Sequence, residues 1–198
     1  MTESPVSRTL MPVARSLALL AGYSLLGLSL LITAEILLRR FLNFSLQGGD
    51  EFGGYVLAII AAFGFAYTLL ERAHTRVEII VERVSPGAQA WLNVISSWCI
   101  AGMGVFLAWR SCATLLESIE FKSLSGTPMM TPLWQPQSLW VVGLLFFALA
   151  STTVAIHSTI LLFSSTRRLN ALYGIKTLNE IIEEETASAL EPREALAK

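Results

Sequence analysis

Few side chains in this sequence could do chemistry, and most of them lie near the ends of long apolar stretches. The two histidines could ligate a haem iron between helices only if they faced each other at one depth. His74 follows one apolar stretch, whereas His157 lies inside another, six residues before its end. The pair therefore cannot ligate one haem, and we expect His157 to be a hydrogen-bonded residue of helix packing.

Other reactive groupings are missing from the sequence. Cys99 and Cys112 are 13 residues apart in one helical pattern, about 20 Å along a helix, too far for a disulfide between them. There is no CxxC motif or Cys/His cluster for zinc or iron–sulfur. The apolar stretches hold no acid/base pair and no nucleophile with its base. We therefore expect no cofactor, no metal site and no enzymatic activity.

Charged residues gather instead around one break, "ILLRRFLNFSLQGGDE" at positions 36–51. Glu35 precedes Arg39 by four residues, the favourable order for an ion pair on a helix. After the glycine pair 48–49, Asp50 is expected to cap the next helix and Glu51 to lie near the positive end of its dipole. Arg40 has no evident partner.

The segment "FLNFSL" (41–46) mixes apolar and polar residues. It could lie along a membrane interface, with Arg39 and Arg40 reaching lipid headgroups or a neighbouring protein.

The composition indicates a membrane protein. The 198 residues are 54% hydrophobic and only 15% charged, with a mean hydropathy of +0.59, whereas soluble domains carry about 25% charged residues. A net charge of −1 offers no basic surface for nucleic acid. Four stretches reach the roughly 20 apolar residues that a membrane-spanning helix needs: about 17–38, 52–70, 90–109 and 139–163.

These stretches predict an all-α integral membrane protein. Its membrane domain spans residues 17–163, between an N-terminal tail at 1–16 and an acidic C-terminal tail at 164–198. Cytoplasmic loops of membrane proteins are enriched in lysine and arginine. If both termini are cytoplasmic, eight such residues near the span ends lie inside and four outside. We therefore expect both termini in the cytoplasm. The outer four are Arg39, Arg40, Arg110 and Lys122.

The connections differ in character. "TRVEIIVERVSPG" (75–87) has apolar residues at i, i+3, i+4 and i+7 spacing, which predicts a short interfacial helix between spans two and three. After Trp109 the pattern stays helical, so the third helix should project beyond the bilayer. The segment 125–137 contains Pro128, Pro132 and Pro136 and is expected to be a loop or cap rather than helix.

Small residues occupy every fourth position of the second span, which allows close helix packing in lipid. They are expected to pack within the protein or against another subunit: Gly54, Ala58, Ala62 and Ala66. Carriers usually need ionisable groups or broken helices at mid-membrane, and the only carboxylate in a span is Glu35, at the end of the first. The pattern therefore favours a scaffold or accessory subunit over a transporter acting alone.

Several motifs in this order resemble the small membrane subunit of TRAP (tripartite ATP-independent periplasmic) transporters, the DctQ type. The resemblance covers about residues 17–163, including the proline-rich "TPMMTPLWQPQSLW" before the last span. Glu78 stands where the family more often has aspartate. The matching residues are Arg40, Phe41 and Asn43 after the first helix, Glu51 opening the second, and His74, Arg76, Val77 and Glu78 after it.

The resemblance implies a set of partners in the bacterial inner membrane. A periplasmic binding protein captures an organic acid and docks on the complex, and a large M-type membrane subunit moves it with a sodium gradient. The small subunit extends the static scaffold in the phospholipid bilayer and would itself bind no substrate. Two alternatives stay open: the membrane anchor of a redox enzyme, and the small subunit of a tripartite tricarboxylate transporter.

Overall fold

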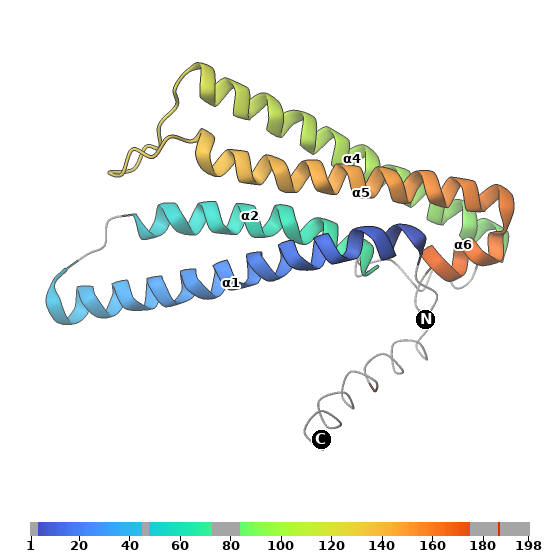
Figure 1. The fold of residues 1–198 in the computed structure, drawn as a ribbon, viewed down its shortest axis with the longest axis horizontal. Helices are drawn as coiled ribbons and strands as arrows, with labels where there is room; N and C mark the ends of the chain where they lie inside the picture. The colour runs from blue at the N-terminus through green and yellow to red at the C-terminus, as the bar shows by residue number, and fades with distance from the viewer. Residues whose placement is uncertain (1–3, 45–47, 73–83, 175–185, 187–198) are drawn as a thin grey trace.

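The computed structural model describes residues 4–44, 48–72, 84–174 and 186, and of Asp50 only the backbone. Within those ranges the fold is all-helical, as expected. Four helices are long and apolar enough to cross a membrane, which confirms the predicted four-span architecture. The helices are α1 (Pro5–Leu42), α2 (Gly49–Leu70), α4 (Pro86–Glu120), α5 (Trp134–Ser164) and α6 (Thr166–Tyr173) (Figure 1). Most of the expected interfacial helix at 75–87 lies outside the described residues.

The helices extend further than their apolar stretches. α1 has 38 residues and α4 has 35, or about 57 and 52 Å at 1.5 Å per residue, against a hydrocarbon core of about 30 Å. α1 begins well inside the expected tail 1–16, because the hydroxyl of Ser4 caps it by accepting a 3.0 Å bond from the N–H of Ser7. α4 continues beyond Trp109 to Glu120, as the sequence predicts.

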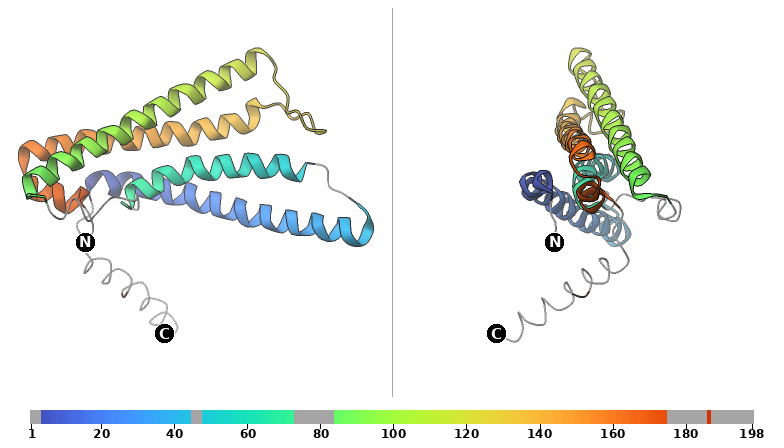
Figure 2. Two further views of the ribbon diagram at one scale, coloured as in Figure 1. Left: turned by 180° about the vertical axis from the view of Figure 1, so that it is seen from behind. Right: turned by 90° about the vertical axis from the view of Figure 1, so that its right-hand side faces the viewer.

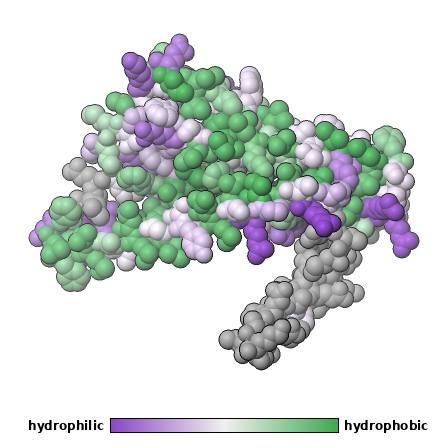
Figure 3. All heavy atoms as spheres, viewed as in Figure 1, coloured by the Kyte–Doolittle hydropathy of each residue, from purple (hydrophilic) through white to green (hydrophobic). Residues whose placement is uncertain are grey.

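The long helices form an open row rather than a closed bundle. α2 and α4 each pack on α5, and α1 packs on α2 with only a small contact to α5. The order across the row is therefore α1, α2, α5, α4, which the end-on view also shows (Figure 2). The row leaves many large hydrophobic side chains exposed, and hydrophobic side chains cover most of the face in Figure 3.

Glycines mark a close approach of α5 to each of its two long neighbours, α2 and α4. A Cβ on Gly143 of α5 would lie 2.6 Å from Phe63 and 2.8 Å from Ala62, both on α2. A Cβ on Gly104 of α4 would lie 2.8 Å from the hydroxyl of Ser151 on α5. Close packing of small residues is the main attractive interaction available to helices in lipid. These two crossings therefore let α5 pack closely on both of its long neighbours.

The expected stripe of small residues on α2 divides at its middle. Ala62 and Ala66 are fully buried, and Ala66 packs with Phe147 and Ala150 of α5. Gly54 and Ala58 are exposed. Ala62 and Ala66, nearer the C-terminal end of α2, thus pack within the chain, whereas Gly54 and Ala58 do not.

α6 lies at the start of the expected C-terminal tail, 164–198. It folds back onto α4 and α5, with Leu169 fully buried and Tyr173 6% exposed. His157 of α5 shares a 2.6 Å hydrogen bond with the hydroxyl of Tyr173. This confirms the hydrogen-bonded role expected of His157, although its partner comes from α6. Burial raises the pKa of the Tyr173 phenol, so it is uncharged at neutral pH.

The row has two distinct ends. At the α6 end lie the N-terminus, α6 and the start of α4 (Figure 1). At the opposite end lie the connection from α1 to α2 and the loop 121–133 from α4 to α5; we call this the junction end.

Candidate functional site

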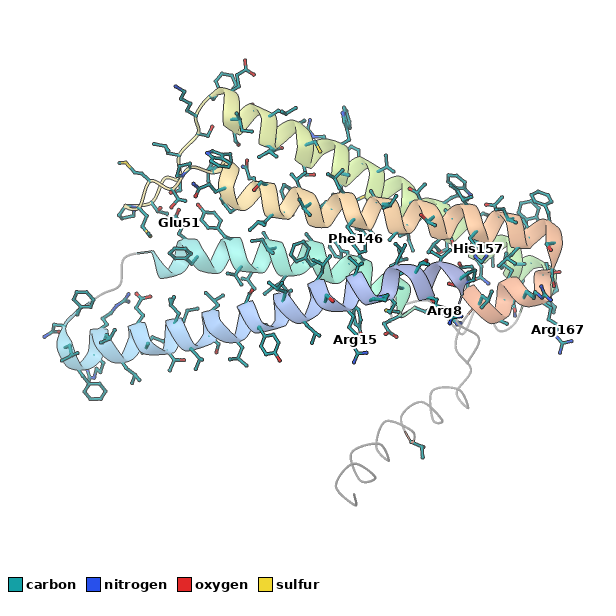
Figure 4. All side chains as sticks on the ribbon, viewed as in Figure 1. Arg8, Arg15, Glu51, Phe146, His157 and Arg167 are labelled. Atoms are coloured by element: carbon teal, nitrogen blue, oxygen red, sulfur yellow. The ribbon has the colours of Figure 1, made fainter. Side chains whose placement is uncertain are left out.

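A buried carboxylate joins two connections at the junction end. Glu51, in the first turn of α2, is only 7% exposed. Its Oε1 accepts a 2.7 Å bond from the hydroxyl of Tyr55, one turn along α2. Its Oε2 accepts a bond from the hydroxyl of Thr127 in the loop 121–133. Figure 4 shows Glu51 directed toward this loop (Figure 4). Glu51 thus ties the start of α2 to the α4–α5 loop.

The loop side of this contact is itself well ordered by hydrogen bonds. The hydroxyls of Ser125 and Thr127 lie 2.8 Å apart. The backbone of Ser125 donates to the carbonyl of Thr131 at 2.9 Å, and the N–H of Thr131 donates to the Ser125 hydroxyl at 3.0 Å. The loop therefore presents its hydroxyls to Glu51 from a fixed hairpin-like turn.

The glycine pair before Glu51 is required by packing. Gly48 has a φ of +112°, a conformation that L side chains rarely adopt, and a Cβ there would collide with the sulfur of Met129 in the α4–α5 loop. A Cβ on Gly49 would collide with the carboxylate of Glu35 on α1. The pair thus brings α1, α2 and the α4–α5 loop together at one point.

Glu35 also forms the ion pair that its spacing predicts. Nη2 of Arg39 lies 2.5 Å from Oε1 of Glu35. The Glu35 side chain is 12% exposed, whereas that of Arg39 is 63% exposed. The pair therefore places a covered carboxylate against Gly49 and a positive charge on the surface. We call the set Glu35, Arg39, Gly48, Gly49, Glu51, Tyr55, Ser125, Thr127 and Met129 the junction.

Arg40 and Asn43 lie beside the junction, at the end of α1. Arg40 is exposed, next to Phe41, whose side chain is 77% exposed. Asn43 ends α1 in the left-handed conformation, with φ +51°, and its N–H donates to the carbonyl of Leu38. Asparagine is the non-glycine residue that best tolerates this conformation. Asn43 therefore has a structural reason to be there, and Arg40 projects from the surface.

Two expectations for this end need correction. Asp50 was expected to cap α2, but the cap position is Gly48 and α2 begins at Gly49, because the positive φ of Gly48 starts the helix two residues earlier. Pro136 was expected in a loop, but α5 begins at Trp134. A proline in the first turn of a helix loses no hydrogen bond there. The predictions for His74, Arg76 and Glu78 fall outside the described residues.

The arrangement is suited to holding elements together and to recognition. Glu51 is fully engaged by hydroxyls of its own chain. Among the described residues, no group of three His, Cys, Asp or Glu side chains could hold a metal ion. What reaches the surface is a positive charge on Arg39 and Arg40 beside exposed aromatic rings. That these arginines face lipid headgroups or a neighbouring protein stays a prediction.

Sequence reasoning missed most partners of the junction. The spacing of Glu51 and Tyr55, four residues apart in one helix, was a readable signal for their contact. Thr127 and Met129 lie more than 70 positions away in the chain, and no local pattern could assign them to Glu51 and Gly48.

Comparison with known protein families gives a match that covers the junction and most of the helical region described above. The family model described as "Tripartite ATP-independent periplasmic transporters, DctQ component" matches residues 28–160. These include all of α2 and α4, most of α5, residues 28–42 at the end of α1, and the junction. The chain matches none of the curated proteins and none of the solved structures. The family match decides between the alternatives that the sequence left open. The chain is a multi-pass membrane protein that belongs to the DctQ family, the small subunits of TRAP transporters.

Proposed function

We propose that this chain is an accessory scaffold that stabilises the large membrane subunit of a sodium-driven TRAP transporter for an organic acid. The observation that carries the proposal is the open row of helices. In the most apolar 18-residue stretch of α1, only 11% of the residues are buried, against 44% in the corresponding stretch of α5. The chain therefore has long apolar helices that its own fold does not cover. A large multi-helix subunit would cover part of them.

The distribution of charge supports an accessory role. Substrate and sodium sites in membrane carriers generally need ionisable groups near mid-membrane. In this chain the carboxylates of the described residues lie near helix ends, and Glu35 and Glu51 are engaged at the junction. The substrate and ion sites are therefore assigned to the large subunit.

We further propose that the α6 end faces the cytoplasm of a bacterial inner membrane and the junction end the periplasm. Cytoplasmic ends of membrane proteins are enriched in arginine and lysine. Among the described residues, the α6 end carries five arginines and one carboxylate, Glu71. The arginines are Arg8, Arg15, Arg72, Arg167 and Arg168. The junction would then lie where a periplasmic binding protein docks.

The test is co-purification of the tagged chain with its large subunit in mild detergent, combined with uptake assays on cells. Arg40→Ala and Glu51→Ala should reduce the recovered large subunit or the uptake rate severalfold. Arg110→Ala is the matched control, since Arg110 is also an exposed cation, on α4. Recovery of a redox enzyme instead of a TRAP subunit would refute the proposal.

Orientation is tested separately with reporters fused to the C-terminus. A green fluorescent protein fused after residue 198 should fluoresce, and alkaline phosphatase in its place should be inactive, because both results require a cytoplasmic C-terminus. The opposite pair of results would invert the assignment of the two ends.

A further inference from the structure

An apolar groove opens between α4 and α5 at the α6 end. Its volume is about 480 Å³. Trp91, Trp98 and Cys99 of α4 and Thr159, Leu162 and Phe163 of α5 line it. The indole N–H of Trp98 donates a 3.0 Å bond to the hydroxyl of Thr159. These two polar groups are therefore satisfied by each other, and the groove offers its occupant an almost wholly apolar surface.

The length and position of the groove match one half of a bilayer. Trp91 and Cys99 are eight residues apart on α4, about 12 Å along the helix, while one leaflet of hydrocarbon is about 15 Å deep. Trp91 and Phe163, at the outer limit of the groove, are 56% and 82% exposed. Indole rings favour the level of the headgroups. The groove thus runs inward from the headgroup level, as an acyl chain does.

α6 packs next to this groove and carries two arginines. Leu169 packs against Ala90 and Val94 of α4 and against Leu162, and Val94 and Leu162 also line the groove. The amide of Asn170 donates to the carbonyl of Pro86 at 2.9 Å, which fixes α6 on the start of α4. The residues directly before Leu169, Arg167 and Arg168, are both exposed; Figure 4 shows Arg167 at this end of the molecule.

Among the described residues, no acidic side chain pairs with the two arginines. The sequence has no Asp or Glu at 84–116 or at 121–179, so α5, α6 and the groove wall of α4 carry none. Neither Arg167 nor Arg168 forms an ion pair within the residues that the structure describes. Within the described part of the chain, the groove therefore combines an almost wholly apolar lining with two cations on the adjacent helix α6 that form no ion pair.

We propose that this groove binds an anionic membrane phospholipid. One acyl chain lies along Trp91 and Trp98, and the headgroup phosphate meets the guanidinium groups of Arg167 and Arg168. Guanidinium groups pair with phosphate through two parallel hydrogen bonds. A helix of a partner protein would also cover the apolar wall, but it would leave the two positive charges on α6 to be neutralised by other means. The proposal is independent of the transport function and of the orientation in the membrane.

The test is quenching of Trp91 and Trp98 fluorescence by lipids brominated in the acyl chain. The full-length chain keeps these two groove tryptophans, with its three other tryptophans changed to phenylalanine, and is reconstituted in phosphatidylethanolamine vesicles. Brominated phosphatidylglycerol or brominated phosphatidylcholine is then added at equal mole fractions. One arginine near an anionic headgroup favours binding by about fivefold. The mole fraction of brominated lipid that quenches half of the fluorescence should therefore be at least about fivefold lower for phosphatidylglycerol than for phosphatidylcholine.

Charge-matched variants make the result specific. Arg167→Gln with Arg168→Gln should remove the headgroup preference and leave quenching by phosphatidylcholine unchanged. Arg8→Gln with Arg15→Gln removes the same charge at the same end but on α1, and should leave the preference intact. Circular dichroism and the tryptophan emission maximum in detergent check that each variant keeps its fold.

Three results would overturn the proposal. Equal quenching by the two lipids would mean that the groove is merely lipid-facing. An equal loss of preference in both charge variants would mean general attraction of anionic lipid to the basic end. Quenching that disappears in the complex with the large subunit would mean that protein occupies the groove.

Discussion

At the scale of single residues, Glu51 is the most consequential side chain described. It is a covered carboxylate on α2 whose acceptor oxygens are used by hydroxyls from its own helix and from the α4–α5 loop. Leaving one side of such a contact unpaired is more costly than removing both. Substitutions of Glu51 and Thr127 should therefore have coupled, non-additive effects on the stability of the fold.

This coupling can be measured with Glu51→Ala, Thr127→Val and the double variant. Each single change should lower the midpoint of thermal unfolding in detergent, because each breaks the same contact. The double variant should lose no more than about the larger of the two single losses. Additive losses would mean that the two residues act separately.

Gly49 provides a second test at this scale. Gly49→Ala should destabilise the fold by about 1–3 kcal/mol, the usual cost of overpacking, because the added Cβ displaces the Glu35 carboxylate and its ion pair with Arg39. Gly53→Ala is the matched control, since a Cβ at Gly53 has no neighbour within 4 Å. Thermal unfolding midpoints compare the two, and equal midpoints would contradict the packing assigned to Gly49.

At the scale of elements, α6 is the helix whose role the sequence did not reveal. It is eight residues long and attached through the buried side chains of Leu169 and Tyr173. The guanidinium of Arg72, at the end of α2, donates a 3.0 Å bond to the carbonyl of Ala171. α6 therefore gathers the ends of α2, α4 and α5.

Leu169→Ala should release α6. Loss of a fully buried leucine costs about 2–4 kcal/mol, which raises the open population of α6 by thirtyfold or more. Limited trypsin digestion of the chain in detergent measures this as faster cleavage after Arg167 and Arg168. The control is Ala171→Ser at an exposed position of α6; similar cleavage of both variants would argue against the docking.

The elements also show what could be read from the sequence and what could not. Length and apolarity predict the four spans because a bilayer requires them, and local spacing predicts the pair of Glu35 and Arg39. Helix ends are set by finer geometry, such as the positive φ of Gly48, so the ends at Pro5, Gly49 and Trp134 differ from expectation. Contacts such as Glu51 with Thr127 depend on the fold as a whole.

At the scale of the whole molecule, α5 packs closely on both of its long neighbours at two crossings marked by glycines. Gly143→Leu should force α5 away from α2, because a side chain at Gly143 meets Phe63 and Ala62. Gly102→Leu is the control, since Gly102 on α4 has no neighbour within 4 Å. The first variant should lower the unfolding midpoint and the monodisperse yield in detergent, while the second should not. Equal behaviour would mean that the α2–α5 crossing contributes little.

The order of the row also bears on how the chain is made. Since α5 lies between α2 and α4, α4 has no long helix to pack on until α5 has been synthesised. The α1–α2 pair can form early, but α4 must wait in the lipid for the rest of the chain. Completion of α5 is thus the step that joins α4 to the α1–α2 pair, and a ribosome that stalls before residue 134 would leave α4 without a helix to pack on.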